Sequence, residues 1–138
     1  MSKKIKEKAE EIVKRYLEEQ GKRVTKLPDT GDLEYDGIRV EVKGDGSDWD
    51  CNQGENIRDW LTLSSEKETK YFENYPDKFE LWCIGCLKKN KRKYPIVKIK
   101  GTELKEFIDK HRDKKQLLLK IKMGKEFWKN RKTKYEYG

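Results

Sequence analysis

The sequence predicts an α/β fold in which helices pack against a central β-sheet. Three observations support this prediction: apolar residues at helical spacing near the N-terminus, an Asp-Gly pair between two alternating runs, and strand-like and helix-like segments that then follow one another. Such alternation favours a sheet covered by helices. The 138 residues, 33% of them hydrophobic, are enough for one small domain.

Residues 3–20 are predicted to form an amphipathic helix. Its apolar positions lie on one face: Ala9, Ile12, Val13, Tyr16 and Leu17. Gly21 is expected to end the helix, because glycine readily adopts the left-handed conformation common just after a helix C-terminus. Glu10 flanks the apolar stripe, whereas Glu11 points nearly opposite to it, so Glu10 is the acidic residue directed toward the fold.

A β-hairpin is predicted after a first strand over residues 22–27 and a turn over residues 28–30. The Asp36-Gly37 pair favours a two-residue type I′ turn, which sets the register of the two strands. The predicted opposed pairs are Tyr35–Ile38, Glu34–Arg39, Leu33–Val40 and Asp32–Glu41. One face is then apolar, with Leu33, Tyr35, Ile38, Val40 and Val42. The other is charged, with Asp32, Glu34, Arg39, Glu41 and Lys43.

Two acidic residues are expected to meet on the charged face. Directly opposed like charges destabilise a sheet, so Asp32 facing Glu41 indicates a cation between them. Mg²⁺ is commonly held by one or two carboxylates, with water and phosphate oxygens completing its shell. Lys43 lies on the same face, within reach of a phosphate on that metal. The alternative is a sheet face exposed to water, on which Lys43 pairs with Glu41.

Asp32 followed by Glu41-Val42-Lys43 on the next strand resembles the signature of the PD-(D/E)XK nuclease superfamily, which includes archaeal Holliday-junction resolvases and many restriction enzymes. The helix, strand and hairpin order is also similar to that superfamily's core, and the resemblance covers about residues 9–85. Pro28-Asp29 also spells "PD", but Asp29 precedes the hairpin and has no cross-strand partner. Asp32 is therefore preferred.

The resemblance implies a restriction-endonuclease-like core, with a mixed central sheet flanked by helices in the order αβββαβ. It implies Mg²⁺, or Mn²⁺ as a substitute, bound by Asp32, Glu41, the Val42 carbonyl and Glu10. Glu10 is chosen because it stands eleven residues before the helix-ending glycine, as in the resolvase-like pattern. Lys43 would orient or help activate the attacking water and neutralise charge in the transition state. The implied activity is metal-dependent endonuclease hydrolysis of DNA, with a structure-specific substrate as one form of it.

Residues 44–60 are rich in turn formers and too long for a simple connector, which is typical of a functional loop. Ser47 and Gln53 are candidates to contact phosphate. Trp49 has two open roles, stacking on a base or covering the core. After this loop, residues 66–74 are predicted to be helical, with Ser64 or Ser65 as the N-cap and Glu68 completing a capping box with Ser65.

Charge is unevenly distributed along the chain. Residues 1–87 have a net charge of −5 and residues 88–138 of +13. The turn between the predicted strands 79–87 and 95–100 carries five basic residues that are expected to contact phosphate: Lys88, Lys89, Lys91, Arg92 and Lys93. The alternative for this turn is a soluble tip that resists aggregation.

The core is expected to span about residues 5–100 of a single domain, 1–138, and a basic extension about residues 101–138. Within the extension, Thr102 is the predicted N-cap of a helix over 103–110, which turns Leu104, Phe107 and Ile108 inward. Residues 116–123 are predicted to form a strand. The tail mixes basic and aromatic residues, which suits either nucleic-acid contact or dimerisation.

Other classes of function find little support. The single histidine has no companion signal for nucleophilic catalysis, and the glycine patterns of nucleotide-binding loops are absent. Cys51, Cys83 and Cys86 lack the paired spacings of structural zinc sites, so we interpret them as buried free thiols.

No apolar run approaches the roughly 20 residues that span a membrane, and no signal peptide is visible. We therefore expect an intracellular, cytoplasmic protein with no membrane partner. The expected partner is DNA, and a homodimer stays open because related resolvases and restriction enzymes often dimerise to cut both strands. Three alternatives stay open: a catalytically inactive nucleic-acid-binding module, an enzyme acting on RNA, and a small interaction module.

Overall fold

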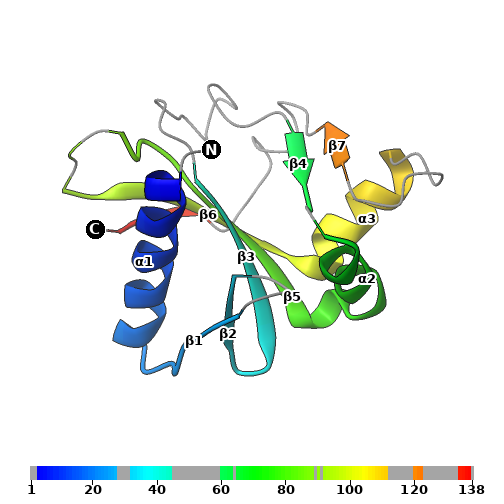
Figure 1. Ribbon diagram of the computed structural model, residues 1–138, viewed down its shortest axis with the longest axis horizontal. Coiled ribbons are helices and arrows are strands. Elements are labelled where there is room, and N and C mark those ends of the chain that lie inside the picture. Colours follow the sequence, from blue (N-terminus) through cyan, green and yellow to red (C-terminus); the bar gives the residue numbers. More distant parts are fainter. Residues whose placement is uncertain are drawn as a thin grey trace.

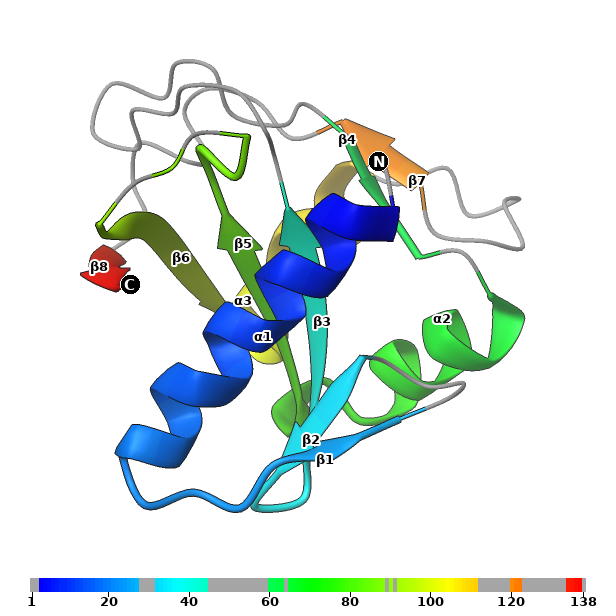
Figure 2. The same ribbon diagram turned by 60° about the vertical axis from the view of Figure 1, so that its left-hand side comes forward.

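The computed structural model describes residues 3–27, 32–44, 60–63, 65–88, 90, 92–111, 120–122 and 134–137. It has a mixed sheet in the order β1-β2-β3-β5-β6-β8, flanked on both faces by helices (Figure 1). Helix α1 (Lys3–Glu19) covers one face, and α2 (Glu66–Asn74) and α3 (Gly101–His111) cover the other (Figures 1 and 2). The predicted α/β class with a helix-flanked mixed sheet is confirmed. Within the described residues, no helix is both long and apolar enough to cross a membrane.

The strands have the following bounds: β1 Thr25–Lys26, β2 Leu33–Tyr35, β3 Ile38–Gly44, β4 Trp60–Thr62, β5 Phe79–Ile84, β6 Tyr94–Lys100, β7 Lys120–Lys122 and β8 Lys134–Tyr137. A single 3₁₀ turn, η1 (Pro76–Lys78), joins α2 to β5. Strands β3 and β5 run parallel, whereas the other pairs in the main sheet are antiparallel.

Helix α1 ends as the sequence predicts. Gly21 has a φ of +80°, the left-handed conformation for which glycine is suited. The amide of Gly21 donates to the Glu18 carbonyl at 3.0 Å and that of Lys22 donates to the Leu17 carbonyl at 3.0 Å. This pair of bonds is a Schellman motif, which satisfies the last carbonyls of the helix. The apolar stripe of α1 is buried against the sheet, with Ala9 and Val13 fully inaccessible.

The hairpin between β2 and β3 is also confirmed. Asp36 and Gly37 have φ values of 48° and 77°, as a type I′ turn requires. Three of the four predicted pairs are present: Leu33–Val40, Glu34–Arg39 and Tyr35–Ile38. The apolar face of the hairpin packs beneath α1 in one core cluster. Strand β1 is shorter than the predicted strand over residues 22–27.

The predicted fourth pair, Asp32 opposite Glu41, is wrong. The Asp32 amide donates to the Val40 carbonyl at 2.8 Å, although Val40 is already the register partner of Leu33. Two residues before the turn therefore face one residue after it, which is a β-bulge. The bulge ends the regular ladder and turns the Asp32 side chain along β3 instead of across to Glu41.

Strand β5 is the centre of the sheet, and all six of its residues are buried. Its side chains alternate between two core clusters. Phe79, Leu81 and Cys83 pack with α2 and α3, whereas Trp82 and Ile84 pack with α1. Because a buried parallel strand has both faces covered, its sequence FELWCI is nearly continuously apolar.

Helix α3 begins at Gly101, so Thr102 lies inside its first turn. The prediction that Thr102 is the N-cap is therefore wrong. A Cβ at position 101 would lie 2.1 Å from the Pro76 carbonyl oxygen and 2.5 Å from that of Phe79. Only glycine lets the start of α3 approach this backbone. Leu104 and Ile108 are buried and Phe107 is partly buried, as predicted.

The region expected as a C-terminal extension contains elements of the main fold. Strand β8 pairs with β6, an interaction that the sequence analysis does not predict. Of the strand predicted over residues 116–123, β7 forms and pairs with β4, while residues 112–119 and 123 lie outside the described ranges. The β4–β7 pair lies at the end of the molecule toward which β3 points (Figure 2).

Replacing Gly101 tests the close approach of α3 to η1 and β5. Gly101→Ala is expected to lower the free energy of unfolding by about 1–3 kcal/mol, because the added methyl group meets backbone atoms that cannot rotate away. Urea denaturation measures the change. The control Thr102→Ala is expected to change stability by less than about 0.5 kcal/mol. The opposite ranking of the two variants would indicate that Thr102 is the N-cap after all.

Candidate active site

Residues from α1, the start of β2 and β3 form the candidate site. Glu10, Asp32 and Glu41 are all buried, which is unusual for charged side chains. They affect one another electrostatically: the Asp32 carboxylate contributes to raising the pKa of both Glu10 and Glu41. The structure therefore brings together the three carboxylates that the sequence analysis selects, although not through the predicted cross-strand pair.

Asp32 is fixed by two bonds. Its Oδ2 accepts a hydrogen bond from the Val42 amide at 2.7 Å, and its Oδ1 pairs with Lys6 Nζ at 3.1 Å. Burial lowers the pKa of Lys6, but the carboxylates of Asp32, Glu41 and Glu10 together outweigh this effect, so the pKa lies above its usual value. In an extended strand the N–H and C=O of one residue point to the same side. The Val42 carbonyl is thus directed to the side of β3 on which Asp32 lies.

Glu10 approaches this group from α1. Burial raises its pKa, and the nearby Asp32 carboxylate raises it further. Its Oε2 lies 3.6 Å from Lys26 Nζ of β1. By contrast, Glu11 is exposed and forms a 3.6 Å ion pair with Arg15 along the helix. The choice of Glu10 over Glu11 as the inward-facing residue is therefore correct.

Glu41 is only 3% exposed. Its Oε1 pairs with Lys43 Nζ at 3.2 Å. Its Oε2 is buried and has no hydrogen-bond partner among the described residues. Burial raises the pKa of Glu41 well above the usual 4.5, and the neighbouring carboxyl groups of Glu68 and Asp32 raise it further, while Lys43 lowers it.

The sequence analysis assigns Glu68 of α2 to a capping box with Ser65 and not to the site. Ser65 is the N-cap as predicted, and its Oγ accepts from the Glu68 amide at 3.1 Å. The Glu68 side chain, however, is buried within hydrogen-bonding range of the Glu41 carboxyl group. The signal was its position four residues before Phe72, because residues at this spacing share one helix face.

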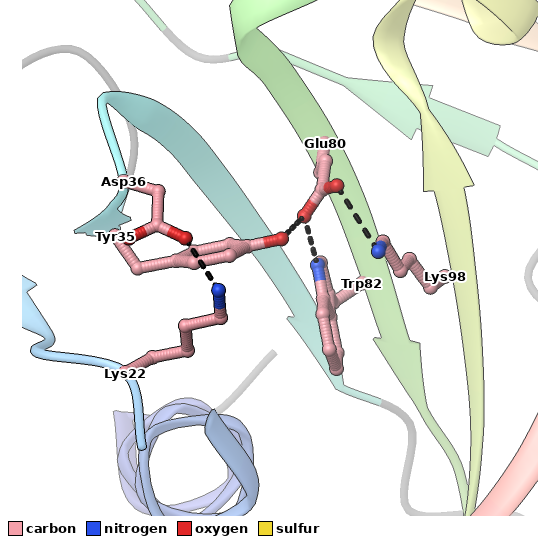
Figure 3. Close-up of polar contacts among 6 residues, drawn as sticks. All are labelled: Lys22, Tyr35, Asp36, Glu80, Trp82 and Lys98. Carbon is pink, nitrogen blue, oxygen red and sulfur yellow. Dashed lines mark hydrogen bonds and ion pairs between the residues drawn. The ribbon is translucent and has the colours of Figure 1, made fainter. Parts of the chain in front are cut away.

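A second buried carboxylate provides a contrast (Figure 3). Glu80 of β5 accepts hydrogen bonds from Tyr35 Oη at 2.5 Å and Trp82 Nε1 at 3.1 Å, and pairs with Lys98 Nζ at 3.2 Å. Burial and the bond to Glu80 raise the pKa of Tyr35 far above its usual value. Glu80 also lines a cavity of about 450 Å³ beside α1, but donors from the protein already engage both of its oxygens.

Lysine ammonium groups accompany each carboxylate that is predicted to bind metal: Lys26 with Glu10, Lys6 with Asp32, and Lys43 with Glu41. Within the described part of the chain, no three His, Cys, Asp or Glu side chains form a ready-made metal site. The groups nearest to such a site are Asp32, Glu41 and the Val42 carbonyl. All are hard oxygen donors, which suit Mg²⁺ or Mn²⁺, and the Glu41 oxygen that has no hydrogen-bond partner among the described residues fits a metal ligand.

Of the predicted nucleic-acid contacts, Lys88, Arg92 and Lys93 are exposed on the β5–β6 turn. Lys8 of α1 anchors this turn, donating to the Leu87 carbonyl at 3.0 Å and lying 4.7 Å from the centre of the Tyr94 ring. Since β3 and β5 are parallel, the turn leaves the sheet at the same edge as the end of β3 (Figure 2). Lys89, Lys91, Ser47, Trp49 and Gln53 lie outside the described residues.

Cys83 and Cys86 are buried and free, as predicted, and belong to the two opposite core clusters. Cys51 lies outside the described residues. No family model matches the chain, and neither the curated proteins nor the solved structures contain a significant match.

Replacing Glu41 tests whether its burial opposes folding. Because the pKa is raised in the folded state, the folded protein binds a proton more tightly than the unfolded chain, and Glu41 destabilises the fold increasingly as the pH rises above 4.5. Glu41→Gln is therefore expected to raise the free energy of unfolding by about 1 kcal/mol at pH 8 without divalent cations, and by less at pH 5. Urea denaturation across this pH range measures both values.

The matched buried control is Glu80→Gln, which is expected to lose stability at pH 8 by about 1.5–3 kcal/mol, because it disturbs satisfied charge-assisted bonds. Equal losses in the two variants would contradict the distinction between these carboxylates.

Proposed function

We propose that this chain is a metal-dependent endonuclease that hydrolyses DNA phosphodiester bonds, with a PD-(D/E)XK-type site on a restriction-endonuclease-like core. The observation that supports this most is the hydrogen bond from the Val42 amide to Asp32. It joins Asp32, the residue before β2, to the middle of the Glu41-Val42-Lys43 tripeptide. The acid, the second acid, the carbonyl and the lysine of the signature therefore converge at the end of one strand.

In the proposed mechanism, Asp32, Glu41 and the Val42 carbonyl would hold Mg²⁺, and Glu10 would reach the ion or its waters. Bound there, the ion supplies a water of lowered pKa and stabilises the charge that develops on the phosphate. The chain itself contributes a rigid set of oxygen donors, because Asp32 is fixed on the backbone of β3 and Glu41 is buried. Rigid placement of donors reduces reorganisation during the reaction.

The lysines gain a second role when the carboxylates share their charge with a cation. Lys43, only 15% exposed and held 3.2 Å from Glu41, would orient the attacking water and neutralise charge in the transition state. Lys6 pairs with Asp32 and is half exposed, so its ammonium group is able to turn toward a substrate phosphate. Both ammonium groups thus offset part of the negative charge of the carboxylates, and they would attract a polyanion.

The basic β5–β6 turn supports the DNA assignment, because Lys88, Arg92 and Lys93 extend from the edge of the sheet that carries the acidic site. A duplex bound at the site would pass within reach of these side chains. RNA presents the same phosphates, so the polymer is decided by the experiment below. A homodimer, which would cut both strands, belongs to the same proposal.

A catalytically inactive nucleic-acid-binding module is the second candidate. The observation in its favour is that lysines pair with Glu10, Asp32 and Glu41 in the structure. Such pairing neutralises the acidic residues without a metal. An inactive module would keep the basic surface and lose only the chemistry.

Asp32→Asn tests catalysis. The variant is expected to lower the rate of Mg²⁺-dependent cleavage at least about 10²-fold, because it removes a charged ligand and weakens the acceptor for Val42. Gel assays with branched, duplex and single-stranded DNA, and with RNA, measure the rate with and without Mg²⁺. Asp36→Asn, at the exposed hairpin turn, is the control and should leave the rate unchanged. Wild-type protein that cuts none of these substrates would favour the inactive module.

The basic turn is tested by binding. Replacing Lys88, Arg92 and Lys93 together by Ala is expected to weaken DNA binding and to lower the slope of log affinity against log salt by up to about 2.7, since each phosphate contact on duplex DNA contributes about 0.9. Fluorescence anisotropy at several salt concentrations gives this slope. Lys105 and Lys110 on α3, replaced together, are the control. An unchanged slope in the triple variant would exclude this turn from the interface.

A further inference from the structure

We propose that Glu68 of α2 is a direct ligand of the divalent cation, which it shares with Glu41. The inference rests on the proposed function, because it adds a fourth carboxylate to the same site. It also extends the site from the edge near α1 to the face of the sheet covered by α2 (Figure 1). Glu68 does not belong to the Asp32, Glu41 and Lys43 signature, and only the fold brings it near.

The carboxyl groups of Glu41 and Glu68 are both buried, and each has an oxygen that lacks a donor among the described residues. Glu41 is 3% exposed and Glu68 is 7% exposed, so both have lost most of their hydration. Glu41 Oε2 and Glu68 Oε1 are each buried, and neither has a hydrogen-bond donor among the described residues. Leaving one such charged oxygen without a partner costs a few kcal/mol, and the Glu68 carboxyl group is near enough to raise the pKa of Glu41.

The negative charge of Glu41 and Glu68 exceeds the positive charge that Lys43 supplies. Lys43 binds Glu41 through Oε1, and within the described part of the chain the other oxygen of that carboxylate has no hydrogen-bond partner. When both carboxyl groups are ionised, as metal binding requires, they and the Lys43 ammonium group have a net charge of −1, and Asp32 adds to the negative potential at Glu41. A divalent cation between the unpartnered oxygens would satisfy both of them. A site of carboxylate oxygens selects hard ions such as Mg²⁺ and Mn²⁺.

Helix α2 is anchored at both Ser65 and Phe72, so that Glu68 faces the sheet. Ser65 caps the first turn, and Phe72, four residues after Glu68, is 1% exposed in the core with Phe79. Residues at this spacing share a helix face. Glu66, in the same first turn, is exposed instead and forms a 3.0 Å ion pair with Lys70. Glu66 and Glu68 are thus the same residue type in the same helical turn, but Glu66 is exposed and Glu68 is buried.

Glu80 is a buried carboxylate whose two oxygens both have donors within the protein. It is the comparison for a buried acid that binds no ligand. Three donors surround Glu80 (Figure 3). Nothing comparable surrounds Glu68 Oε1 among the described residues. The difference is what a ligand site requires, because its oxygens must remain available to the ion.

Binding of Mn²⁺ in the absence of nucleic acid tests the inference. Isothermal titration calorimetry would compare wild-type protein with Glu68→Gln and with the matched control Glu66→Gln, each checked for folding by circular dichroism. Glu68→Gln is expected to weaken Mn²⁺ binding at least about tenfold, since even indirect partners of a metal site contribute 10- to 100-fold. Glu66→Gln should bind like wild-type. Wild-type-like binding by Glu68→Gln, or no binding by the wild type, would overturn the inference.

A thiol substitution tests direct ligation. Because thiolates prefer soft ions, Glu68→Cys is expected to bind Cd²⁺ at least about tenfold more tightly than Glu66→Cys and to show thiolate-to-cadmium absorption. Equal Cd²⁺ affinity in the two variants would overturn direct ligation.

These outcomes are separate from those of the proposed function. If Glu68→Gln binds Mn²⁺ normally while Asp32→Asn loses cleavage, the nuclease stands and the role of Glu68 fails. If Mn²⁺ binding depends on Glu68 but the wild type cuts no nucleic acid, the metal site stands and the nuclease fails.

Discussion

The bond between the Val42 amide and Asp32 is the constraint on which the site depends. The bulge at Asp32 ends the pairing of β2 with β3, and this bond replaces the missing ladder bond with a side chain. A carboxylate is thereby fixed on the backbone between Glu41 and Lys43. Without the bulge, Asp32 would continue the strand and its side chain would follow the alternation of the sheet. A local break in regular structure therefore positions the Asp32 carboxylate of the candidate site, and bulges are common beside active sites.

The buried acids divide into two classes, and the division has a physical meaning. Glu80 is surrounded by donors from three strands and strengthens the packing between α1 and the sheet. Glu41 and Glu68 each keep an oxygen without a donor among the described residues, which opposes folding. A stable domain tolerates such a cost where function requires it, and the local rules of packing are violated mainly at such places. A buried carboxylate oxygen without a donor therefore identifies the candidate site better than burial of the carboxylate alone.

The topology explains how distant segments reach one edge. Strands β3 and β5 are parallel, so the end of β3, with Lys43, and the basic turn after β5 leave the sheet together. Helix α1 crosses this region with its N-terminal half, so that Lys6 and Glu10 approach Asp32 while Lys8 anchors the basic turn. Negative and positive groups thus lie at the same end of the molecule. This arrangement suits a phosphate chain that must meet a metal and lysines at once.

Local signals in the sequence determined the elements whose causes are local. The type I′ turn at Asp36-Gly37, the Schellman end of α1 at Gly21 and the Ser65 cap depend on a few adjacent residues, and each was predictable. The inward position of Glu10 followed from helical periodicity. The start of α3 was not predictable, because Gly101 is required by the backbone of Pro76 and Phe79, which are distant in sequence. Strand β8 likewise depends on a partner 40 residues away, Tyr94–Val97 of β6.

The candidate site divides in the same way. Periodicity and the hairpin register selected Asp32, Glu41 and Lys43 from the sequence alone, because neighbouring strands impose their own spacing. Only the tertiary structure decided how these groups meet: the bulge redirects Asp32, lysines from α1 and β1 pair with the acids, and α2 brings Glu68 to Glu41. The reason is that burial and charge compensation arise from contacts between elements, which no local pattern of residues encodes.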